Sequence, residues 1–264
     1  MRSFLAFAVT GFRRHSAYRA ATLAGATTNT VFGVVKASIT VAAIGSAGGV
    51  LAGYDVRQGV TYAFLCQALI GPVLLFGSSE LGERVRTGDI AVDLSRPVDL
   101  QLSMLGTDLG RAAFQVLPRG VPPLAVGALF FGLTLPTSAL PYLLGALSVP
   151  LAVALSFACR FLLNLAAFWL LDLRGLLTLY LVSSNVFSGL IIPVPWFPDW
   201  LDLAARLTPF PSMLQTPVDV LSGRVSGWSA AGLVLVQGAW LVGVLVIGRV
   251  VLARATRRLV VQGG

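Results

Sequence analysis

The segment from Trp228 to Leu252 reads WSAAGLVLVQGAWLVGVLVIGRVVL. It contains one charged residue, Arg249, and it is long enough to cross a hydrocarbon layer about 30 Å thick, which takes roughly 20 residues of helix. The rest of the chain is similar: 56% of its 264 residues are hydrophobic and 11% are charged, against roughly 25% charged in an average soluble domain. The sequence therefore predicts an all-α polytopic membrane protein.

Six such apolar runs are expected to span the membrane within a single transmembrane domain that covers residues 1–264. They are residues 21–47, 58–80, 104–134, 140–171, 176–193 and 228–252. The second run contains Gly71-Pro72, which predicts a kink. Residues 1–20 are too short and too basic to span, and they predict an amphipathic helix on the membrane surface. Residues 194–226 are too rich in proline, tryptophan and aspartate to form a regular span.

The arginines between these runs predict the orientation of the chain. Its net charge is +8, and six spans place both termini on one side of the membrane. Fourteen arginines fall on that side: Arg2, Arg13, Arg14, Arg19, Arg84, Arg86, Arg96, Arg111, Arg119, Arg174, Arg249, Arg254, Arg257 and Arg258. Three fall on the other side: Arg57, Arg206 and Arg224. Because cytoplasmic loops carry an excess of arginine and lysine, we expect both termini and residues 80–101 to be cytoplasmic.

The residues that catalysis and metal binding require are scarce. The chain has one histidine, His15, in the basic N-terminal segment, so it has no pair of zinc-binding histidines and shows no pattern of a Ser-His-Asp triad. Cys66 and Cys159 lie inside apolar runs, where cysteine behaves as a small hydrophobic residue. The single lysine, Lys36, lacks the glycine-rich spacing of a phosphate-binding loop. We therefore expect no catalytic residue, metal or cofactor in this chain, and no nucleic-acid partner.

The polar section between the second and third runs ends in TGDIAVDLSRPVDLQ, residues 87–101. Gly88 permits a sharp entry, and Asp89 favours the start of a short helix. Ile90 and Leu94 are four residues apart and share one face, which suits an apolar groove on a partner. Arg96 precedes Pro97, which ends the element, and Asp99 is placed to cap the next helix. The alternative is a solvated loop with incidental apolar residues.

The first run carries polar and small residues on one face. Thr22, Ala26, Asn29, Gly33, Lys36 and Thr40 follow helical spacing. Such a face indicates either close packing of helices or part of a translocation pathway. A lysine near the middle of a span is costly unless it is paired or hydrated, and its partner is expected among helix carbonyls, water, a neighbouring subunit or an anionic substrate. The alternative is that Lys36 extends to the interface as an anchor. Further polar residues inside predicted spans are Gln67, Asn164 and Asn185, and each is expected either to make a hydrogen bond at a helix interface or to contact substrate in the pathway.

Two longer stretches resemble one protein family. TGDIAVDLSRPVDLQ followed by DLGRAAFQVLPRG (residues 108–120) is similar to the cytoplasmic region of permease subunits of type-2 ATP-binding-cassette exporters, in a bacterial branch common in actinobacteria. WFPDWLDLAARLTPFPSMLQTPVDVLSGR (residues 196–224) is similar to the outer segment of the same branch. The order of a basic N-terminus, six spans, a long section between the second and third spans, and a broken segment before the last span also resembles this family across nearly the whole chain.

The resemblance implies a permease subunit in the bacterial plasma membrane, which forms half of a pathway for an amphipathic drug, antibiotic, lipid or glycan. It implies two copies of a separate ATPase subunit that bind ATP and Mg, and a second permease subunit, with a heterodimer favoured over a homodimer. Membrane lipids surround the assembly. Two other functions remain open: a secondary transporter driven by an ion gradient, which is typically marked by acids at the membrane midplane, and a membrane scaffold without transport.

The resemblance also implies roles for individual residues. A coupling helix that docks into the ATPase lies within residues 80–101 and involves Gly88, Asp89, Ile90, Asp93, Leu94, Arg96, Pro97 and Asp99. Glu80, Glu83, Arg84 and Arg86 are either a relay for its movement or surface ion pairs worth less than about 1 kcal/mol. The outer segment, residues 194–226, is implied to form short re-entrant helices that close the outer mouth. Its gate involves Pro193, Pro195, Trp196, Pro198, Pro209 and Pro211.

Overall fold

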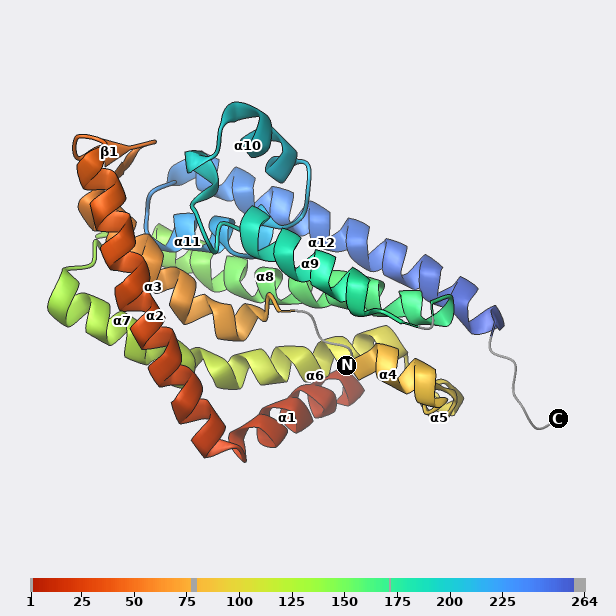
Figure 1. Cartoon of the computed structure of the whole chain (residues 1–264). Coiled ribbons are helices and arrows are strands. Elements are labelled where there is room, and N and C mark those ends of the chain that lie inside the picture. The colour runs from red at the N-terminus through yellow and green to blue at the C-terminus, as the bar shows by residue number, and fades with distance from the viewer. Residues whose placement is uncertain (1, 77–79, 171, 259–264) are drawn as a thin grey trace.

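The computed structural model describes residues 2–76, 80–170 and 172–258, and Figure 1 shows an almost entirely helical molecule. Residues 1, 77–79 and 171 of the predicted elements lie outside this part of the chain. Four helices within it are long and apolar enough to cross a membrane: α2 (Arg19–Ser46), the continuous helix Leu100–Phe131, α8 with its 3-10 extension (Leu140–Phe168), and α12 (Gly227–Ala255). They confirm an all-α membrane protein and correspond to the first, third, fourth and sixth predicted spans.

The helices at the second and fifth predicted spans are shorter. α3 (Val56–Val73) has 18 residues and α9 (Arg174–Phe187) has 14, which at 1.5 Å per residue gives about 27 and 21 Å. The predicted span 58–80 is wrong at its end: the helix ends at Val73, and Leu74 adopts a left-handed conformation with φ of 54°. Pro72 therefore lies in a last turn and not at a kink within a longer helix. The count of six spans remains a prediction.

The helix Leu100–Phe131 changes its pitch at its prolines. α6 (Leu100–Gln115) leads into a π-helical turn, η1 (Val116–Gly120), then α7 (Val121–Val126) and a second π-helical turn, η2 (Gly127–Phe131). Pro118, Pro122 and Pro123 have no backbone N–H to donate, so the regular i to i−4 pattern is interrupted. The wider turns keep the helix continuous.

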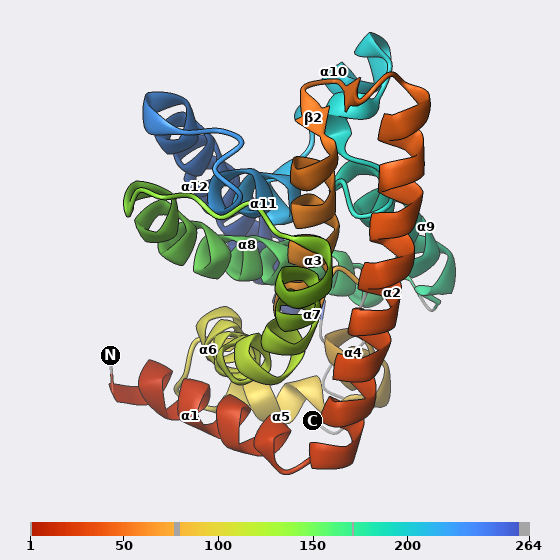
Figure 2. The ribbon, with the colours of Figure 1, turned by 90° about the vertical axis from the view of Figure 1, so that its left-hand side faces the viewer.

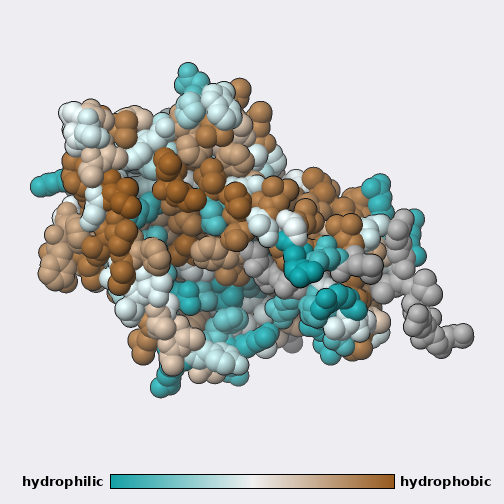
Figure 3. All heavy atoms as spheres, in the orientation of Figure 1, coloured by the Kyte–Doolittle hydropathy of each residue, from teal (hydrophilic) through white to brown (hydrophobic). Residues whose placement is uncertain are grey.

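Two groups of short elements lie at opposite ends of the molecule (Figures 1 and 2). One end has α1 (Arg2–Ser16), α4 (Glu80–Thr87) and α5 (Ile90–Ser95). The other has a two-stranded hairpin, β1 (Val50–Leu51) and β2 (Tyr54–Asp55), with α10 (Asp199–Arg206). Figure 3 shows hydrophobic atoms over α2 and α9, and mostly hydrophilic atoms near α1 and α4. The exposed hydrophobic residues of α2, such as Phe32 and Ile39, suit contact with lipid.

Between these ends, α3 is the most enclosed long element. Its residues 59–73 are all buried, and it contacts α2, α6, α8 and α11 (Gln215–Leu221). The main core is built around it, with Tyr62, Cys66 and Val73 from α3 packed against Leu155 of α8 and Met213 before α11. Cys66 and Cys159 are free thiols, as the sequence predicts.

The N-terminal helix packs directly on α6. Backbones approach closely at two glycines: a side chain at Gly11 would lie 2.1 Å from the Thr107 carbonyl oxygen, and one at Gly110 would lie 1.9 Å from the Ala8 carbonyl oxygen. Phe12 and Phe114 meet edge to face at 5.5 Å beside this crossing. The predicted N-terminal helix is therefore confirmed, and its place on the membrane surface stays a prediction.

We expect Gly110→Ala to weaken the packing of α1 on α6. The added methyl group meets a backbone carbonyl, which cannot move aside as a flexible side chain can. Overpacking of this kind typically costs about 1–3 kcal/mol, measurable as the free energy of unfolding in a detergent titration. Gly232→Ala in α12 is the matched control, since no atom lies within 4 Å of its methyl group. Equal stability of the two variants would contradict the close crossing.

Candidate functional site

The segment that joins α4 to α5 has the boundaries that the sequence predicts. Gly88 has φ of +85°, a left-handed conformation that favours glycine. α5 ends at Ser95, because Arg96 is extended before Pro97. Asp99 caps α6 by accepting a hydrogen bond from the Leu102 N–H at 2.9 Å, and its carboxylate also contacts Arg249.

Asp89 starts α5 without capping it. Its carboxylate accepts a hydrogen bond from the Thr87 hydroxyl at 2.8 Å and makes no hydrogen bond to the N–H groups of the helix. The side chain is exposed, on the outward side of the turn. Its predicted effect on the helix is therefore limited to its charge near the N-terminus.

The apolar face of α5 packs on the chain's own core, whereas the sequence predicted that it would face a partner. Ile90 is fully buried in the chain's own core, next to Leu81 and Leu100, and Leu94 is partly buried against the same cluster. The prediction that Ile90 and Leu94 form an outward docking face is therefore wrong. The sequence showed that they share a face, but it did not show that this face covers a cluster at the inner ends of α6 and α8. Val92 is the exposed large apolar residue of α5, with 56% of its surface accessible, and the smaller Ala91 is exposed beside it.

α4 is tied to its neighbours by polar contacts. Arg84 forms an ion pair with Asp93 at 2.6 Å, which links α4 to α5. The amide oxygen of Asn164 accepts a hydrogen bond from the Gly82 N–H at 2.9 Å, which links α4 to α8. Asn164, predicted as a pathway or interface residue, therefore lies at a helix interface.

The other charged residues of α4 make exposed contacts. Glu80 lies 3.5 Å from Arg14 of α1, and Glu83 lies 2.8 Å from Arg86 on α4 itself. All four side chains are more than half exposed. Only Arg84 of the four predicted relay residues thus connects α4 to α5.

A buried ion network, consisting of Asp108, Arg111 and Arg160, lies between α6 and α8. The Asp108 carboxylate accepts hydrogen bonds from Arg111 Nε at 2.7 Å and from Arg160 Nη2 at 2.8 Å. All three residues are less than 10% exposed. Arg111 also donates to the carbonyls of Gly71 and Pro72, the residues that end α3.

This network is not among the sites predicted from the sequence. Asp108 is buried within the helix Leu100–Phe131, which covers most of the third predicted span. Two signals were present: Asp108 and Arg111 are spaced i, i+3 on one helix, and Arg160 stands alone inside an apolar run. A single sequence gave no indication that the three side chains meet.

The polar face of the first span packs against α3 of the same chain. Asn29 donates to the Gln67 carbonyl oxygen at 3.1 Å, and a side chain at Gly33 would lie 2.9 Å from the Phe64 ring. Thr40 is buried beside Gly59. These contacts favour the interpretation of this face as a surface for close helix packing over its interpretation as part of a translocation pathway.

Lys36 reaches from this face to the outer segment. Its Nζ donates a hydrogen bond to the Leu190 carbonyl oxygen and lies 5.0 Å from the centre of the Tyr62 ring. Its partner is thus a backbone carbonyl, but one that lies in the turn after α9 and not in a helix as the sequence suggested. The side chain is half-buried and connects α2 to the turn after α9. Whether it lies in a pathway or acts as an anchor at the interface stays a prediction.

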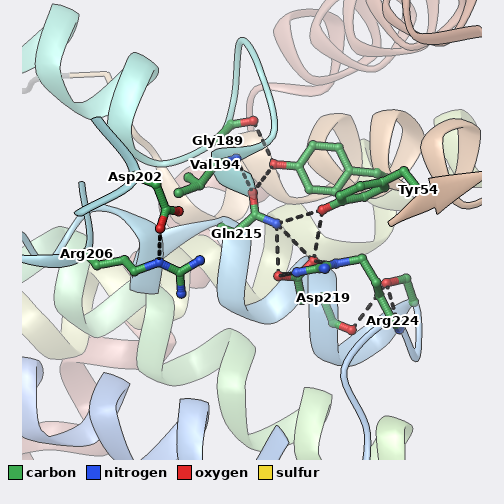
Figure 4. Close-up of polar contacts among 10 residues, drawn as sticks. Tyr54, Gly189, Val194, Asp202, Arg206, Gln215, Asp219 and Arg224 are labelled. Atoms are coloured by element: carbon green, nitrogen blue, oxygen red, sulfur yellow. Dashed lines mark hydrogen bonds and ion pairs between the residues drawn. The ribbon is translucent and has the colours of Figure 1, made fainter. Parts of the chain in front are cut away.

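The outer segment is fixed by a hydrogen-bond network centred on Gln215 (Figure 4). Gln215 Oε1 accepts from the Val194 N–H at 3.0 Å and lies 2.7 Å from the Tyr62 hydroxyl, which lies equally close to the Gly189 carbonyl. Gln215 Nε2 donates to the Tyr54 hydroxyl at 3.0 Å and to Asp219 at 2.9 Å. One side chain therefore joins β2, α3, α11 and the turn before α10.

Asp219 completes this network with a bidentate ion pair. Its carboxylate accepts from Arg224 at 2.6 and 2.5 Å, and the Arg224 guanidinium lies 4.8 Å from the centre of the Tyr54 ring. Burial lowers the pKa of Arg224, but hydrogen bonds and attraction to Asp219 outweigh it and raise the pKa. Asp219 lies within the predicted outer segment, residues 194–226, but no role was predicted for it, although Gln215 and Asp219 are spaced i, i+4.

The prolines of the outer segment act as predicted on the backbone. Pro193 and Pro198 immediately precede η4 (Val194–Trp196) and α10, and Pro211 starts η5 (Pro211–Met213). Pro195 lies within η4, and Pro209 lies between α10 and η5. The helices of this segment are at most eight residues long, which confirms that it is broken. Their role as a gate remains a prediction.

Two other predicted residues lie near this segment. The Trp196 ring packs edge to face on Tyr54 at 5.9 Å and belongs to the core. The side-chain oxygen of Asn185 on α9 is buried and has no hydrogen-bond partner in the part of the chain that the structure describes. The structure therefore gives Trp196 a packing role and assigns no contact to the Asn185 oxygen.

We expect Gln215→Leu to lower the free energy of unfolding by about 1–3 kcal/mol, because buried groups such as the Val194 N–H lose their partner. Gln58→Leu is the matched control, since the Gln58 side chain accepts one hydrogen bond, at 3.3 Å from the Asp55 N–H, near the surface. A detergent unfolding titration compares the two. A loss no larger for Gln215→Leu than for Gln58→Leu would show that the network does not hold the outer segment.

Comparison with known proteins assigns most of the chain to a family. The model of a family described as ABC-2 family transporter protein matches residues 34–263. This range includes Lys36, the buried ion network, α4, α5 and the whole outer segment, and it excludes α1. No curated protein matches the chain.

Proposed function

Because the chain belongs to the ABC-2 family of transporter proteins, we propose that it forms half of the translocation pathway of an ATP-driven exporter and couples to a separate ATPase through α5. The family makes the chain a transmembrane permease subunit that is not itself catalytic, and it implies an ABC ATPase as partner. The chain is accordingly a multi-pass membrane protein. The coupling element, the direction of transport and the composition of the assembly are parts of the proposal.

The observation that carries the proposal is the position of α5. It is a six-residue helix outside the four long helices, entered through Gly88 and ended by Pro97, and it presents Val92 outward. A simple connector between α3 and α6 does not need a separate short helix such as α5. A partner that grips the outer face of α5 gains an apolar contact from Val92, with Asp89 and Arg96 exposed beside it.

The contacts of α4 supply a route from that surface into the spanning helices. Movement of α5 acts on α4 through the Arg84–Asp93 ion pair, which is partly buried. Movement of α4 acts on α8 through the hydrogen bond from the Gly82 N–H to Asn164. Ile90 and Leu94 keep α5 seated on the core during this movement. We propose that closure of the ATPase dimer moves these elements together.

At the opposite end, the Gln215 network and Lys36 hold the outer segment closed. Alternating access requires that this end open when the α5 end is engaged, so the Lys36 contact with the Leu190 carbonyl is proposed to break in that state.

Two permease subunits, with a heterodimer favoured, and two ATPase subunits complete the assembly in the bacterial plasma membrane, with both termini cytoplasmic. The substrate is proposed to be an amphipathic drug, antibiotic, lipid or glycan.

The alternative of an ion-driven transporter gains no support from Asp108. This acid is buried between spans, where a proton relay would need one, but two guanidiniums hold its carboxylate. It thereby acts as a fixed counter-charge for two arginines.

Purification of the full chain from its native membranes tests the proposed function. We expect an ATPase with a phosphate-binding loop, identified by mass spectrometry, to copurify in equal amount to the permease subunits, and the complex to hydrolyse ATP. An unrelated polytopic membrane protein carrying the same tag is the control. Recovery of the folded chain without such an ATPase would contradict the exporter assignment.

A further inference from the structure

A cavity of about 540 Å³ lies between α1, α4, α6 and α8, at the end of the molecule that carries α5. Its volume falls in the range of roughly 300–1,000 Å³ that is usual for small-molecule sites. It reaches from the buried ion network to the contact between Arg14 and Glu80. Arg84, Asp93 and Asn164, which the proposed function uses as a route from α5 to α8, also line it.

The charged lining of the cavity is unbalanced. Five arginines line it, against three acids: Arg14, Arg84, Arg96, Arg111 and Arg160, with Glu80, Asp93 and Asp108. The described lining therefore carries an excess of two positive charges, and His15 lies beside it. Arg84 is paired with Asp93, and Arg14 lies near Glu80. The excess thus belongs to Arg96 and to the two arginines that share Asp108.

Arg160 is the buried member of this excess. It is 6% exposed, and its Nη2 is bound to Asp108. Its Nε makes a long contact, 3.5 Å, with the Ser156 hydroxyl. The terminal nitrogens of Arg111, in contrast, are occupied by Gly71, Pro72 and Gln115. Because the buried Arg160 also lines the cavity, its guanidinium is suited to a ligand that brings an oxygen anion.

The rest of the wall is apolar. Phe7 of α1, Met104 of α6, and Phe157 and Phe161 of α8 line the same cavity. An inorganic anion would leave this surface without a partner, whereas an amphiphile with an anionic head covers both kinds of wall. The cavity also borders the ends of spanning helices, where lipid headgroups lie.

A weak, exposed ion pair lies at the edge of the cavity. Arg14 and Glu80 lie 3.5 Å apart across it, and their side chains are 62% and 57% exposed. An exposed pair of this kind contributes at most about 1 kcal/mol, so it does not bar entry. Arg96, exposed and without an ion pair in the described part of the chain, borders the cavity next to α5.

We propose that this cavity binds the phosphate headgroup of an anionic phospholipid, with Arg160 and Arg96 as the phosphate contacts and the aromatic wall against the glycerol and upper acyl region. The bound lipid joins α1 and α8 to the segment that follows α5. This proposal does not depend on the exporter function, because it concerns the purified chain without nucleotide.

Binding of short-chain lipids to the full chain in detergent, followed by native mass spectrometry, tests the proposal. Dihexanoyl phosphatidylglycerol is expected to bind one-to-one, at least tenfold more tightly than dihexanoyl phosphatidylcholine or inorganic phosphate. Equal binding of the two lipids would overturn the role of the arginines. Equal binding of inorganic phosphate would overturn the assignment to a lipid.

Three arginine variants locate the site. Arg160→Gln and Arg96→Gln are each expected to weaken phosphatidylglycerol binding at least tenfold. Arg86→Gln, an exposed arginine of α4 outside the cavity, is the control and should leave binding unchanged. Arg96 is exposed, so its variant remains informative if Arg160→Gln does not fold. Unchanged binding in Arg96→Gln, or an equal loss in Arg86→Gln, would overturn the proposed site.

Discussion

Asp108→Asn is expected to lower the free energy of unfolding by about 3–5 kcal/mol, the usual result of leaving a buried charge without its counter-charge. The substitution keeps the shape of the side chain but removes the negative charge that two guanidiniums share. Both arginines are less than 10% exposed, so hydration compensates only a small part of the lost charge. The change is measurable by titration of the purified chain with a denaturing detergent in mixed micelles.

Two further variants separate charge from packing. Arg160→Gln should cost less, because Asp108 retains its pair with Arg111. Glu83→Gln is the exposed control: its pair with Arg86 has side chains 54% and 66% exposed, and its loss should change stability by less than about 1 kcal/mol. If Asp108→Asn were as stable as Glu83→Gln, the network would not contribute to the fold.

Val92→Lys is expected to abolish the stimulation of ATP hydrolysis by substrate in the assembled transporter, while the protein still inserts and folds. Val92 is the outward apolar residue of α5, so a charge there opposes burial in a partner's groove without disturbing the chain's own core. The measurement is ATPase activity of the purified complex with and without substrate. Leu94→Ala would not test docking, because Leu94 packs on the core.

Val50→Lys is the matched control for this prediction. Val50 is 60% exposed, close to the 56% of Val92, but it lies in the hairpin at the opposite end of the molecule. Its substitution should leave stimulation unchanged. Full stimulation in Val92→Lys, or an equal loss in Val50→Lys, would show that α5 does not dock through this face.

Much of the fold can be predicted from the sequence, because a helix that spans lipid must be long and apolar. The long apolar runs, the break at Pro97 and the interrupted helices after Pro193 are local properties of the chain. The end of α3 at Val73 is not local: the apolar run continues to Phe76, and the helix stops where Arg111 binds the carbonyls of Gly71 and Pro72. A run of apolar residues therefore predicts that a helix exists, but it does not predict the residue at which the helix ends.

The candidate site was harder to predict than the fold, since its residues meet across large separations in the chain. Ile90 and Leu94 were correctly placed on one face of α5, but which side that face covers depends on Leu81 and Phe161. Asp108 meets Arg160 from 52 residues away, and Gln215 meets Tyr54 from 161 residues away. The spacing rules of helices give no information about such pairs.

The burial of α3 has a consequence for how the protein is made. α3 is not among the helices that qualify as membrane spans by length and apolarity, and its residues 59–73 are buried by neighbours that include α6, α8 and α11. All three of these follow it in the sequence, so a ribosome delivers α3 to the membrane before most of the surface that covers it exists. Of the elements that contact α3, α2 and the short strand β2 precede it. We therefore expect α3 to leave the translocon as a pair with α2, through Asn29 and Gly33, and to reach its final position after α8 is synthesised.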